Sequence, residues 1–263
     1  MTQATNSNET RVALITGAAA GIGADTARAF AATGITVVGF DVDDEQGRRT
    51  FAEIGAPHAY RTLDVRDSMQ WKAAVAAVVA DFGRLDIVYL NAGVMTRPKG
   101  NPLLDDALEW LTPQGYRKVM GVNLDGVVFG VIAALTAPTV SQIIITASGA
   151  AVLPLAMDPY YTASKYAVLG LGLSLHEALD KRGIRLDVIC PGAIGTSMAA
   201  PDIVAMVKQE SPAFVADCVV KLISMKERGP IWLAFTEKQG LRRYDVPGVP
   251  GMSGALDVTE KAP

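Results

Sequence analysis

The chain has 263 residues, half of them apolar, and a formal charge of −3. This length and apolar content suffice for one sizeable core, and the absence of any Lys/Arg cluster argues against nucleic acid and anionic membranes as partners. The most apolar stretch, residues 126–135, is too short to span a membrane, and residues 1–10 lack the basic region and apolar run of a signal peptide. We therefore expect one cytoplasmic domain that binds small molecules.

Rare side chains argue against two further kinds of site. Cys190 falls in a predicted strand and Cys218 in a predicted helix, so we expect two buried thiols rather than a disulfide. His58 and His176 do not have the spacing of metal ligands, and we predict no metal site.

The first predicted strand leads into a glycine-rich turn. Residues 12–15 form a continuous apolar run, typical of a strand buried on both faces, and a helix-like segment follows the turn. Between them, Gly17, Gly21 and Gly23 allow the backbone to approach a pyrophosphate at the helix N-terminus. An ordinary strand-to-helix turn is the alternative, but the flanking elements favour dinucleotide binding, with Ile22 inside the same turn.

Acidic residues follow the next two predicted strands. The second strand ends at Asp41, which can accept both ribose hydroxyls of NAD and would repel the 2′-phosphate of NADP; the alternative is a turn residue. A third strand, residues 59–63, delivers Asp64 and Val65 to the same edge. There Asp64 either accepts the adenine amino group or caps the helix over residues 68–82. The predicted cofactor is NAD.

Small residues and one amide mark the middle of the chain. The fourth predicted strand ends in Asn91, Ala92 and Gly93, where backbone can lie against a flat ring, with a plain turn as the alternative. A long helix is predicted to start at residues 112–113 and to run past Asn123. A buried amide must be hydrogen-bonded, so Asn123 either bridges to neighbouring backbone or holds a water for proton transfer.

A hydroxyl, a phenol and an ammonium follow at spacings that suit oxidation of an alcohol. Ser148 comes just after a fifth apolar strand, where open α/β sheets place their ligands. Tyr161 and Lys165 are four residues apart, so on a helix they share one face. We expect the Lys165 cation to lower the pKa of the Tyr161 phenol by about 1–3 units and so make it a general base. A surface contact is the alternative for this pair taken alone.

The last predicted units complete a sheet. A sixth strand ends at Pro191, and residues 193–196 can bring backbone and the Thr196 hydroxyl to a carboxamide. Strand–helix alternation throughout predicts an α/β protein with a doubly wound parallel sheet and helices on both faces. We assign residues 11–244 to this domain, residues 1–10 to a disordered start and residues 245–263 to an irregular tail.

Apolar side chains are expected around the reacting carbon. Residues 197–211 form a predicted lid with apolar side chains and Lys208 as its only base. This composition predicts an apolar secondary alcohol or ketone as the substrate. The substrate contacts that we predict are Met95, Val152, Leu155, Met157, Ala193 and Met198.

With these residues in hand, residues 11–235 closely resemble the short-chain dehydrogenase/reductase family. The match is the ordered set of the glycine turn, Asp64, Asn91-Ala-Gly, Asn123, Ser148, Tyr161-x-x-x-Lys165 and Pro191-Gly. The resemblance implies a Rossmann fold and a tetrad. In it, Tyr161 exchanges the alcohol proton, Ser148 orients the substrate oxygen, Lys165 tunes Tyr161 and binds the nicotinamide ribose, and Asn123 holds a relay water. Ile194 and Thr196 match positions around the nicotinamide amide.

The family's usual ending is replaced here by Ala234-Phe235-Thr236-Glu237 and an extended tail, and this altered ending has a diffuse likeness to the 15-hydroxyprostaglandin dehydrogenase branch. We predict an NAD-dependent alcohol dehydrogenase or ketone reductase that forms a homo-oligomer, a tetramer or a dimer. The alternatives are a catalytically idle NAD-binding sensor, an enzyme for a small polar diol or sugar, and a sugar-nucleotide epimerase. The first would be expected to lose Tyr161 or Lys165, and the last normally needs a larger C-terminal domain.

Overall fold

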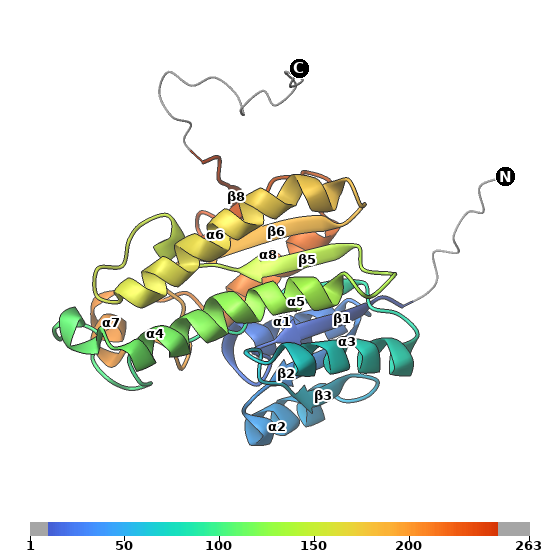
Figure 1. Cartoon of the computed structure of the whole chain (residues 1–263), viewed down its shortest axis with the longest axis horizontal. Helices are drawn as coiled ribbons and strands as arrows, with labels where there is room; N and C mark the ends of the chain where they lie inside the picture. Colours follow the sequence, from blue (N-terminus) through green and yellow to red (C-terminus); the bar gives the residue numbers. More distant parts are fainter. Residues whose placement is uncertain (1–9, 247–263) are drawn as a thin grey trace, which may run out of the picture.

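The computed structural model describes residues 10–246, whose centre is one eight-stranded sheet (Figure 1). The strand order is β3-β2-β1-β4-β5-β6-β7-β8, and every neighbouring pair is parallel except β7 and β8. The chain thus winds from β1 to one edge and then to the other, and reverses between β1 and β4. This is the predicted doubly wound sheet. Its strands are β1 (Val12–Thr16), β2 (Thr36–Asp41), β3 (Ala59–Thr62), β4 (Ile87–Leu90), β5 (Gln142–Thr146), β6 (Arg185–Pro191), β7 (Ile231–Ala234) and β8 (Arg242–Arg243).

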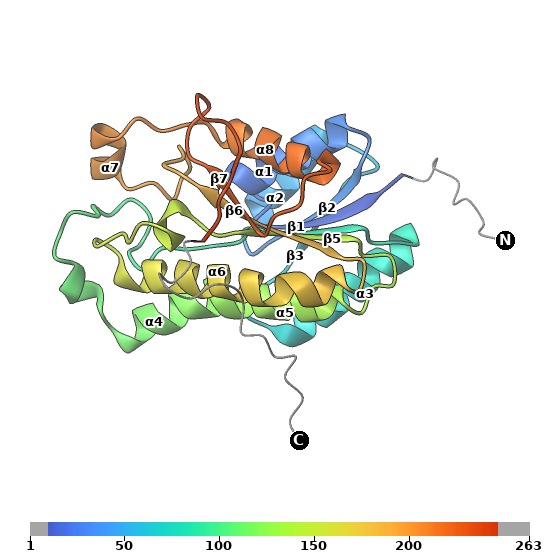
Figure 2. The ribbon, with the colours of Figure 1, turned by 90° about the horizontal axis from the view of Figure 1, so that it is seen from above.

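Helices cover both faces of the sheet, as Figure 2 shows. On one face lie α1 (Gly21–Ala32), α2 (Asp44–Ile54) and α8 (Pro212–Ser224). On the other lie α3 (Ser68–Phe82), α4 (Pro113–Met120), α5 (Gly126–Ala134) and α6 (Pro159–Asp180). The short helix α7 (Pro201–Met206) lies at the same end of the molecule as α4 and the start of α6. Two 3-10 turns complete the set, η1 (Ala107–Trp110) and η3 (Gly149–Ala151).

The core consists of two apolar layers, one on each face of the sheet. Alternate residues of β1 point to opposite layers, with Val12 and Leu14 in one and Ala13 and Ile15 in the other. Both sets are buried, which explains why the strand reads as a continuous apolar run instead of an alternating one.

The predicted strands agree with the structure within two residues at either end, but the structure also contains elements that were not predicted, among them α7, η1 and η3. The long helix predicted from residues 112–113 is continuous from α4 through α5, but its middle is the π-helical turn η2 (Gly121–Asp125). Such turns carry one extra residue and recur at functional sites. Strand β8 was not predicted, because a two-residue edge strand leaves no hydrophobic pattern. The expected disordered start and irregular tail lie almost wholly outside the described residues.

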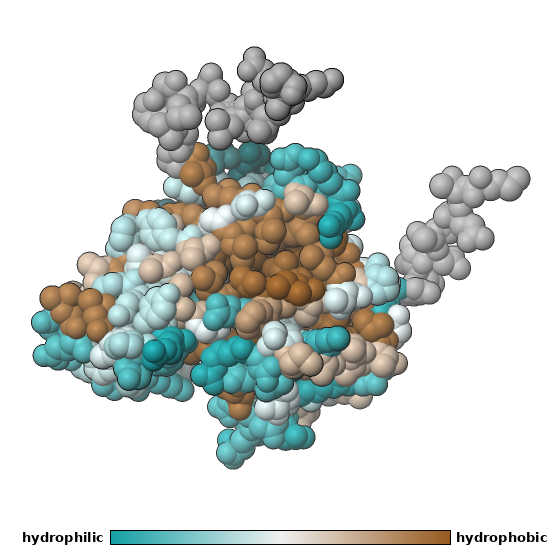
Figure 3. Space-filling model, viewed as in Figure 1, coloured by the Kyte–Doolittle hydropathy of each residue, from teal (hydrophilic) through white to brown (hydrophobic). Residues whose placement is uncertain are grey.

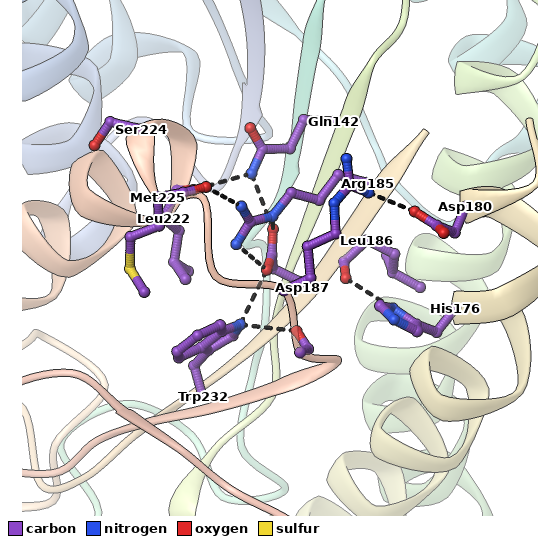
Figure 4. Close-up of polar contacts among 12 residues, drawn as sticks. Gln142, His176, Asp180, Arg185, Leu186, Asp187, Leu222, Ser224, Met225 and Trp232 are labelled. Carbon is purple, nitrogen blue, oxygen red and sulfur yellow. Dashed lines mark hydrogen bonds and ion pairs between the residues drawn. The ribbon is translucent and has the colours of Figure 1, made fainter. Parts of the chain in front are cut away.

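One buried polar cluster lies at the amino ends of β5, β6 and β7 (Figure 4). Asp187 is fully buried and accepts two hydrogen bonds from Arg185, at 2.7 and 2.8 Å. Gln142 and Trp232 each donate a further bond to it, both at 2.9 Å. Arg185 also donates to the carbonyl of Met225. The cluster therefore joins three strands to the end of α8.

Within residues 10–246, no helix is both long enough and apolar enough to cross a membrane. Cys190 and Cys218 are both free and buried, as expected. In this same range, no group of three or more His, Cys, Asp or Glu side chains is arranged to hold a metal ion.

Candidate active site

A cavity of about 720 Å³ opens at the carboxyl ends of β1, β4, β5 and β6, next to the reversal of the sheet. Parallel sheets of this kind bind ligands at that edge. The cavity brings together residues that are far apart in the sequence. Of the predicted cofactor and catalytic residues, its wall contains Gly17, Gly21, Ile22, Asp41, Asn91, Ala92, Gly93, Ser148, Tyr161, Lys165, Pro191, Ile194 and Thr196.

Two glycines of the turn after β1 adopt the left-handed backbone conformation. Gly17 and Gly21 have φ angles of +68° and +57°, which residues other than glycine rarely adopt. Gly23 does not line the cavity; a Cβ there would lie 2.1 Å from the carbonyl oxygen of Gly17, so its role is close packing of α1 on the turn. The N-cap of α1 is Ala20, and no side chain caps this helix. Its first amide groups are therefore suited to hold a pyrophosphate.

Asp41 stands at the end of β2 with its carboxylate fixed by backbone amides. It accepts hydrogen bonds from Ala19 at 3.1 Å, Val42 at 2.8 Å and Asp43 at 3.1 Å. These bonds fix the carboxylate of a residue that lines the cavity.

Asp64 and Val65 lie outside the cavity wall. The alternative prediction for Asp64, that it caps the helix at residue 68, is wrong, because the cap is Asp67, which accepts from the backbone amides of Met69 and Gln70. The Asp64 carboxylate is held by Arg66, whose guanidinium keeps its pKa below the ordinary value. Val65 is buried in the core layer, and its carbonyl oxygen accepts a hydrogen bond from Trp71 Nε1 at 3.0 Å.

Asn91, which follows β4, connects this strand to β1 and β5 through its side-chain hydrogen bonds. Its Nδ2 donates to the carbonyl of Thr16 at 3.1 Å, and its Oδ1 accepts from Thr146 at 3.1 Å. Thr16 in turn accepts from the amides of Asn91 and Ala92. Asn91 and Ala92 are therefore positioned by side-chain bonds, not by the turn alone.

Asn123 is fully buried in the π-helical turn. Its Oδ1 accepts from Val94 N at 2.8 Å, and its Nδ2 donates to Val94 O at 2.9 Å and to Ser164 Oγ at 3.0 Å. The first alternative, a bridge to neighbouring backbone, is thus confirmed. Both amide hydrogens are engaged, and the side chain pins the loop that follows β4 to α6.

Of the four predicted catalytic residues, Ser148, Tyr161 and Lys165 line the cavity, and Asn123 does not. Ser148 follows β5 by two residues and caps η3 through Ala150 N at 3.1 Å. Tyr161 and Lys165 lie on one face of α6, as predicted, with Lys165 Nζ 5.6 Å from the centre of the Tyr161 ring. Lys165 Nζ donates to the carbonyl of Thr146, the last residue of β5, at 2.9 Å. Helix α6 and strand β5 together set this arrangement.

The prediction that Lys165 lowers the pKa of Tyr161 is wrong. Burial raises the pKa of the Tyr161 phenol; the Ser148 hydroxyl opposes this rise and the Asp158 charge adds to it. Burial also lowers the pKa of Lys165 from 10.5 to about 8. The sequence argument considered the opposite charge but not the loss of water around both groups, which is the larger effect here.

Most of the predicted substrate contacts line the cavity: Met95, Leu155, Met157, Ala193 and Met198. Val152 is an exception, because it packs against the core and its neighbour Leu153 lines the cavity instead. Leu103 and Phe235 were missed. Phe235 follows β7 and could have been found from the rule that ligands lie at the carboxyl ends of strands, whereas no local signal marks Leu103.

Comparison with known proteins identifies the class of this chain. The family model for short chain dehydrogenases matches residues 11–204. (+)-Borneol dehydrogenase 1 of Salvia officinalis is 36% identical over 202 residues, which are 74% of this chain and 74% of the relative. A 3-alpha-(or 20-beta)-hydroxysteroid dehydrogenase of Mycobacterium bovis is 34% identical over 223 residues, covering 81% of this chain and 82% of the relative.

Solved structures give the same result. The 3-ketoacyl-(acyl-carrier-protein) reductase of Brucella melitensis, complexed with NADH, matches this chain with a TM-score of 0.76 at 26% identity. The matched region covers 87% of this chain and 97% of the reductase chain. A short chain dehydrogenase/reductase of Burkholderia phymatum in complex with NAD has a TM-score of 0.73 at 25% identity and covers 88% of this chain and 90% of its own. The protein belongs to the short-chain dehydrogenase/reductase family of oxidoreductases, which bind NAD(H). The sequence-based prediction of family and cofactor is confirmed at this level.

Proposed function

We propose that this protein is an NAD-dependent dehydrogenase/reductase that transfers a hydride between NAD and an apolar secondary alcohol or its ketone. The observation that carries the proposal is that Tyr161 and Ser148 share one cavity with the glycine turn and with Asp41. A dinucleotide held between the turn and Asp41 would extend toward the phenol. When bound, it supplies or accepts the hydride at its nicotinamide ring.

In ketone reduction, Tyr161 acts as the proton donor. Its raised pKa keeps the phenol protonated at neutral pH, so it can transfer a proton to the carbonyl oxygen as the alcohol forms. The Ser148 hydroxyl donates a hydrogen bond to the same oxygen and fixes its position. Oxidation runs in reverse and needs the phenolate, so we expect the rate of oxidation to rise with pH more steeply than that of reduction. The Lys165 ammonium, 5.6 Å from the ring centre, stabilises the charge that forms.

Asp41 supports NAD as the preferred cofactor. Its carboxylate lines the cavity, and residues 18–20 of the turn contain no basic side chain that would bind a 2′-phosphate. We expect kcat/KM to be higher with NAD than with NADP, and Asp41→Ala to narrow this difference. Comparable wild-type values for both cofactors would contradict the assignment. Asp41→Ala also removes the acceptor of the Ala19 N–H, which affects the glycine turn whichever cofactor binds. The affinities for NAD and for NADP are therefore measured separately by fluorescence titration.

The apolar cavity wall supports the substrate class. Apolar side chains of the wall that Tyr161 shares include Met95, Leu155, Met157 and Met198, and Lys208 is the one base that the lid segment contributes to this wall. Each buried methylene of a substrate contributes about 0.8 kcal/mol, so kcat/KM is expected to rise with ring or chain size until the cavity is filled.

A substrate panel tests this function directly. NAD is mixed with cyclohexanol, borneol, a hydroxysteroid, a long-chain secondary alcohol, glycerol, a sugar and lactate, and the absorbance of reduced cofactor is followed. Apolar cyclic or long-chain alcohols are expected to give the highest kcat/KM, with Tyr161→Phe as the blank. A better rate with glycerol, the sugar or lactate would contradict the substrate class but leave the hydride chemistry in place. No rate with any alcohol or its ketone would favour an idle NAD-binding sensor.

An apolar face supports self-association. Figure 3 shows a broad apolar patch over α5 and α6. Large apolar side chains on it are exposed, among them Ile132 at 60%, Leu135 at 39% and Leu173 at 37%. Patches of this kind mark protein contacts, and we propose a second copy of this chain as the partner, in a dimer or tetramer. Light scattering that detects only a species of the monomer mass, 27.7 kDa, would contradict this proposal.

A further inference from the structure

Asp158 is a buried carboxylate directly before the helix that carries Tyr161 and Lys165. Only 1% of it is exposed, and no ion pair between residues 10 and 246 involves it. As the N-cap of α6 its Oδ1 accepts the backbone N–H of Tyr161 at 3.0 Å. The same carboxylate accepts two further bonds from Thr96, which is 62 positions away: the hydroxyl binds Oδ1, and the backbone N–H binds Oδ2 at 2.9 Å.

The partner of Asp158 belongs to the wall of the substrate cavity. Thr96 follows Met95, whose side chain lines the cavity. On the other side of Met95, the backbone of Val94 is held at both its N–H and its C=O by Asn123. Met95 is therefore fixed between two buried polar anchors. One of these anchors, Asp158, also holds the backbone of Tyr161.

Asp67, the carboxylate that caps α3, makes no such connection. Within residues 10–246 it accepts bonds only from its own helix, from Met69 N at 2.8 Å, Gln70 N at 3.2 Å and the Gln70 side chain at 3.1 Å. Capping alone thus needs neither burial nor a distant partner. Oδ1 accepts from both Tyr161 N–H and the Thr96 hydroxyl, and Oδ2 accepts the Thr96 N–H, so the three bonds together use both carboxylate oxygens. An asparagine or serine side chain has one accepting oxygen and cannot accept all three in this geometry.

We propose that Asp158 is a positioning residue that fixes the substrate wall at Met95 relative to the phenol of Tyr161. The inference rests on the proposed function, because it assigns Asp158 a part in presenting the substrate to Tyr161. Asp158 does not touch the reacting atoms. It acts through the backbone of Tyr161 and through Thr96, and a displacement of about 1 Å between such groups can slow catalysis by about 10²-fold.

The charge of Asp158 provides a second, independent way to test the proposal. Its negative charge contributes to the raised pKa of Tyr161, after burial as the main cause. Removing the charge is therefore expected to lower the pKa of Tyr161. The other titratable groups that face this region are Lys165 on α6, Cys190 on β6, Lys208 on the cavity wall, Lys118 at the carbonyl of Thr96, and Arg97 beside Thr96.

The experiment compares Asp158→Ser, Asp158→Asn and Thr96→Val with the wild type, using NAD and the panel alcohol of highest kcat/KM. Serine keeps an acceptor for the Tyr161 N–H but leaves Thr96 without its partner. We expect kcat to fall by about 10- to 100-fold in Asp158→Ser, with NAD affinity unchanged in fluorescence titration. Thr96→Val is expected to raise KM for the alcohol, and its effect is not additive with that of Asp158→Ser.

Asp67→Ser is the matched control, because it makes the same change at a helix cap remote from the cavity. It is expected to leave kcat, KM and the pH profile unchanged. If Asp158→Ser lowers only the thermal stability, as Asp67→Ser does, and leaves kcat and KM at wild-type values, Asp158 is a structural cap and the proposal is overturned.

A readout without substrate separates this inference from the proposed function. Ultraviolet difference titration follows ionisation of the phenol, with Tyr161→Phe identifying the signal of Tyr161. In Asp158→Asn the Tyr161 signal is expected to appear at lower pH than in the wild type. An unchanged titration would overturn the electrostatic part of the proposal even if no panel alcohol is turned over. Absence of turnover in the wild type, by contrast, would count against the proposed function alone.

Discussion

Each end of strand β5 is bound by a buried charged group from another element, Asp187 of β6 at Gln142 and Lys165 of α6 at Thr146, and the two groups differ in how fully they are paired. At the amino end, Asp187 accepts bonds from Arg185, Gln142 and Trp232 (Figure 4), so both of its oxygens are engaged. At the carboxyl end, Lys165 is 3% exposed and, within residues 10–246, makes a single hydrogen bond, to Thr146 O. The two charged groups are buried to a similar extent, but Asp187 is hydrogen-bonded to three side chains whereas Lys165 is hydrogen-bonded to one carbonyl.

This difference indicates which end is reactive. A buried charge with a full set of partners stabilises one arrangement of the strands and has no capacity left for a ligand. The Lys165 ammonium can donate three hydrogen bonds but finds one acceptor among the described residues, Thr146 O. Its loss of water is therefore poorly compensated, and its pKa falls to about 8. Incomplete pairing beside a cavity is typical of a functional site.

The largest expected effect is at the carboxyl end. Tyr161→Phe removes the proton-exchanging hydroxyl while leaving the glycine turn and Asp41 intact, so kcat is expected to fall by about 10²–10⁴-fold with NAD still bound. Stopped-flow or steady-state absorbance of reduced cofactor gives kcat, and fluorescence titration gives the affinity. Because Tyr161 is only partly buried and lines the cavity, removal of its hydroxyl is expected to leave the temperature of thermal unfolding nearly unchanged. A variant that retains more than about a tenth of wild-type kcat would defeat the assignment.

The opposite outcome is expected at the amino end. Asp187→Asn leaves the Arg185 guanidinium buried without its charge partner, and the free energy of unfolding is expected to fall by about 3 kcal/mol. Chemical denaturation measures this change. Since the cluster lies at the far end of β5 from Tyr161, kcat of the folded fraction should stay at the wild-type value.

A double variant sharpens this test. Replacing both partners, in Arg185→Met/Asp187→Leu, removes the charges together and is expected to cost less stability than Asp187→Asn alone. A loss of kcat in either variant, at unchanged fold, would show that the two ends of β5 are not independent.

The smallest expected effect is a pH dependence of stability from Lys165. The unfolded side chain holds its proton up to about pH 10.5, whereas the folded one releases it near pH 8. Between these values the unfolded state binds more protons, so the free energy of unfolding rises with pH, by at most about 1.4 kcal/mol per unit. Denaturation curves between pH 8 and 9 are compared with those of Lys165→Met, which should lack this rise. If the free energy of unfolding changed with pH in the same way in the wild type and in Lys165→Met, the lowered pKa of Lys165 would be contradicted.

Local sequence determined the elements and much of the cavity wall. Continuous apolar runs define strands buried on both faces, and the positive φ angles of Gly17 and Gly21 explain why glycine is needed there. Because parallel strands end at one edge, the residues after β1, β2, β4, β5 and β6 were predicted to meet, and most of them do. These inferences succeed because each depends on a few neighbouring residues and one general rule of sheet geometry.

Tertiary structure alone decided the contacts between segments remote in sequence, and with them the electrostatics. Leu103 reaches the cavity, Val152 turns into the core, and Asp158 binds Thr96, none of which has a local signal. The pKa of Tyr161 was predicted to fall and instead rises, because burial is set by every segment packed around the phenol and not by the lysine four residues away. Spacing along a helix determines which groups are neighbours, but the amount of water removed around them depends on the whole fold.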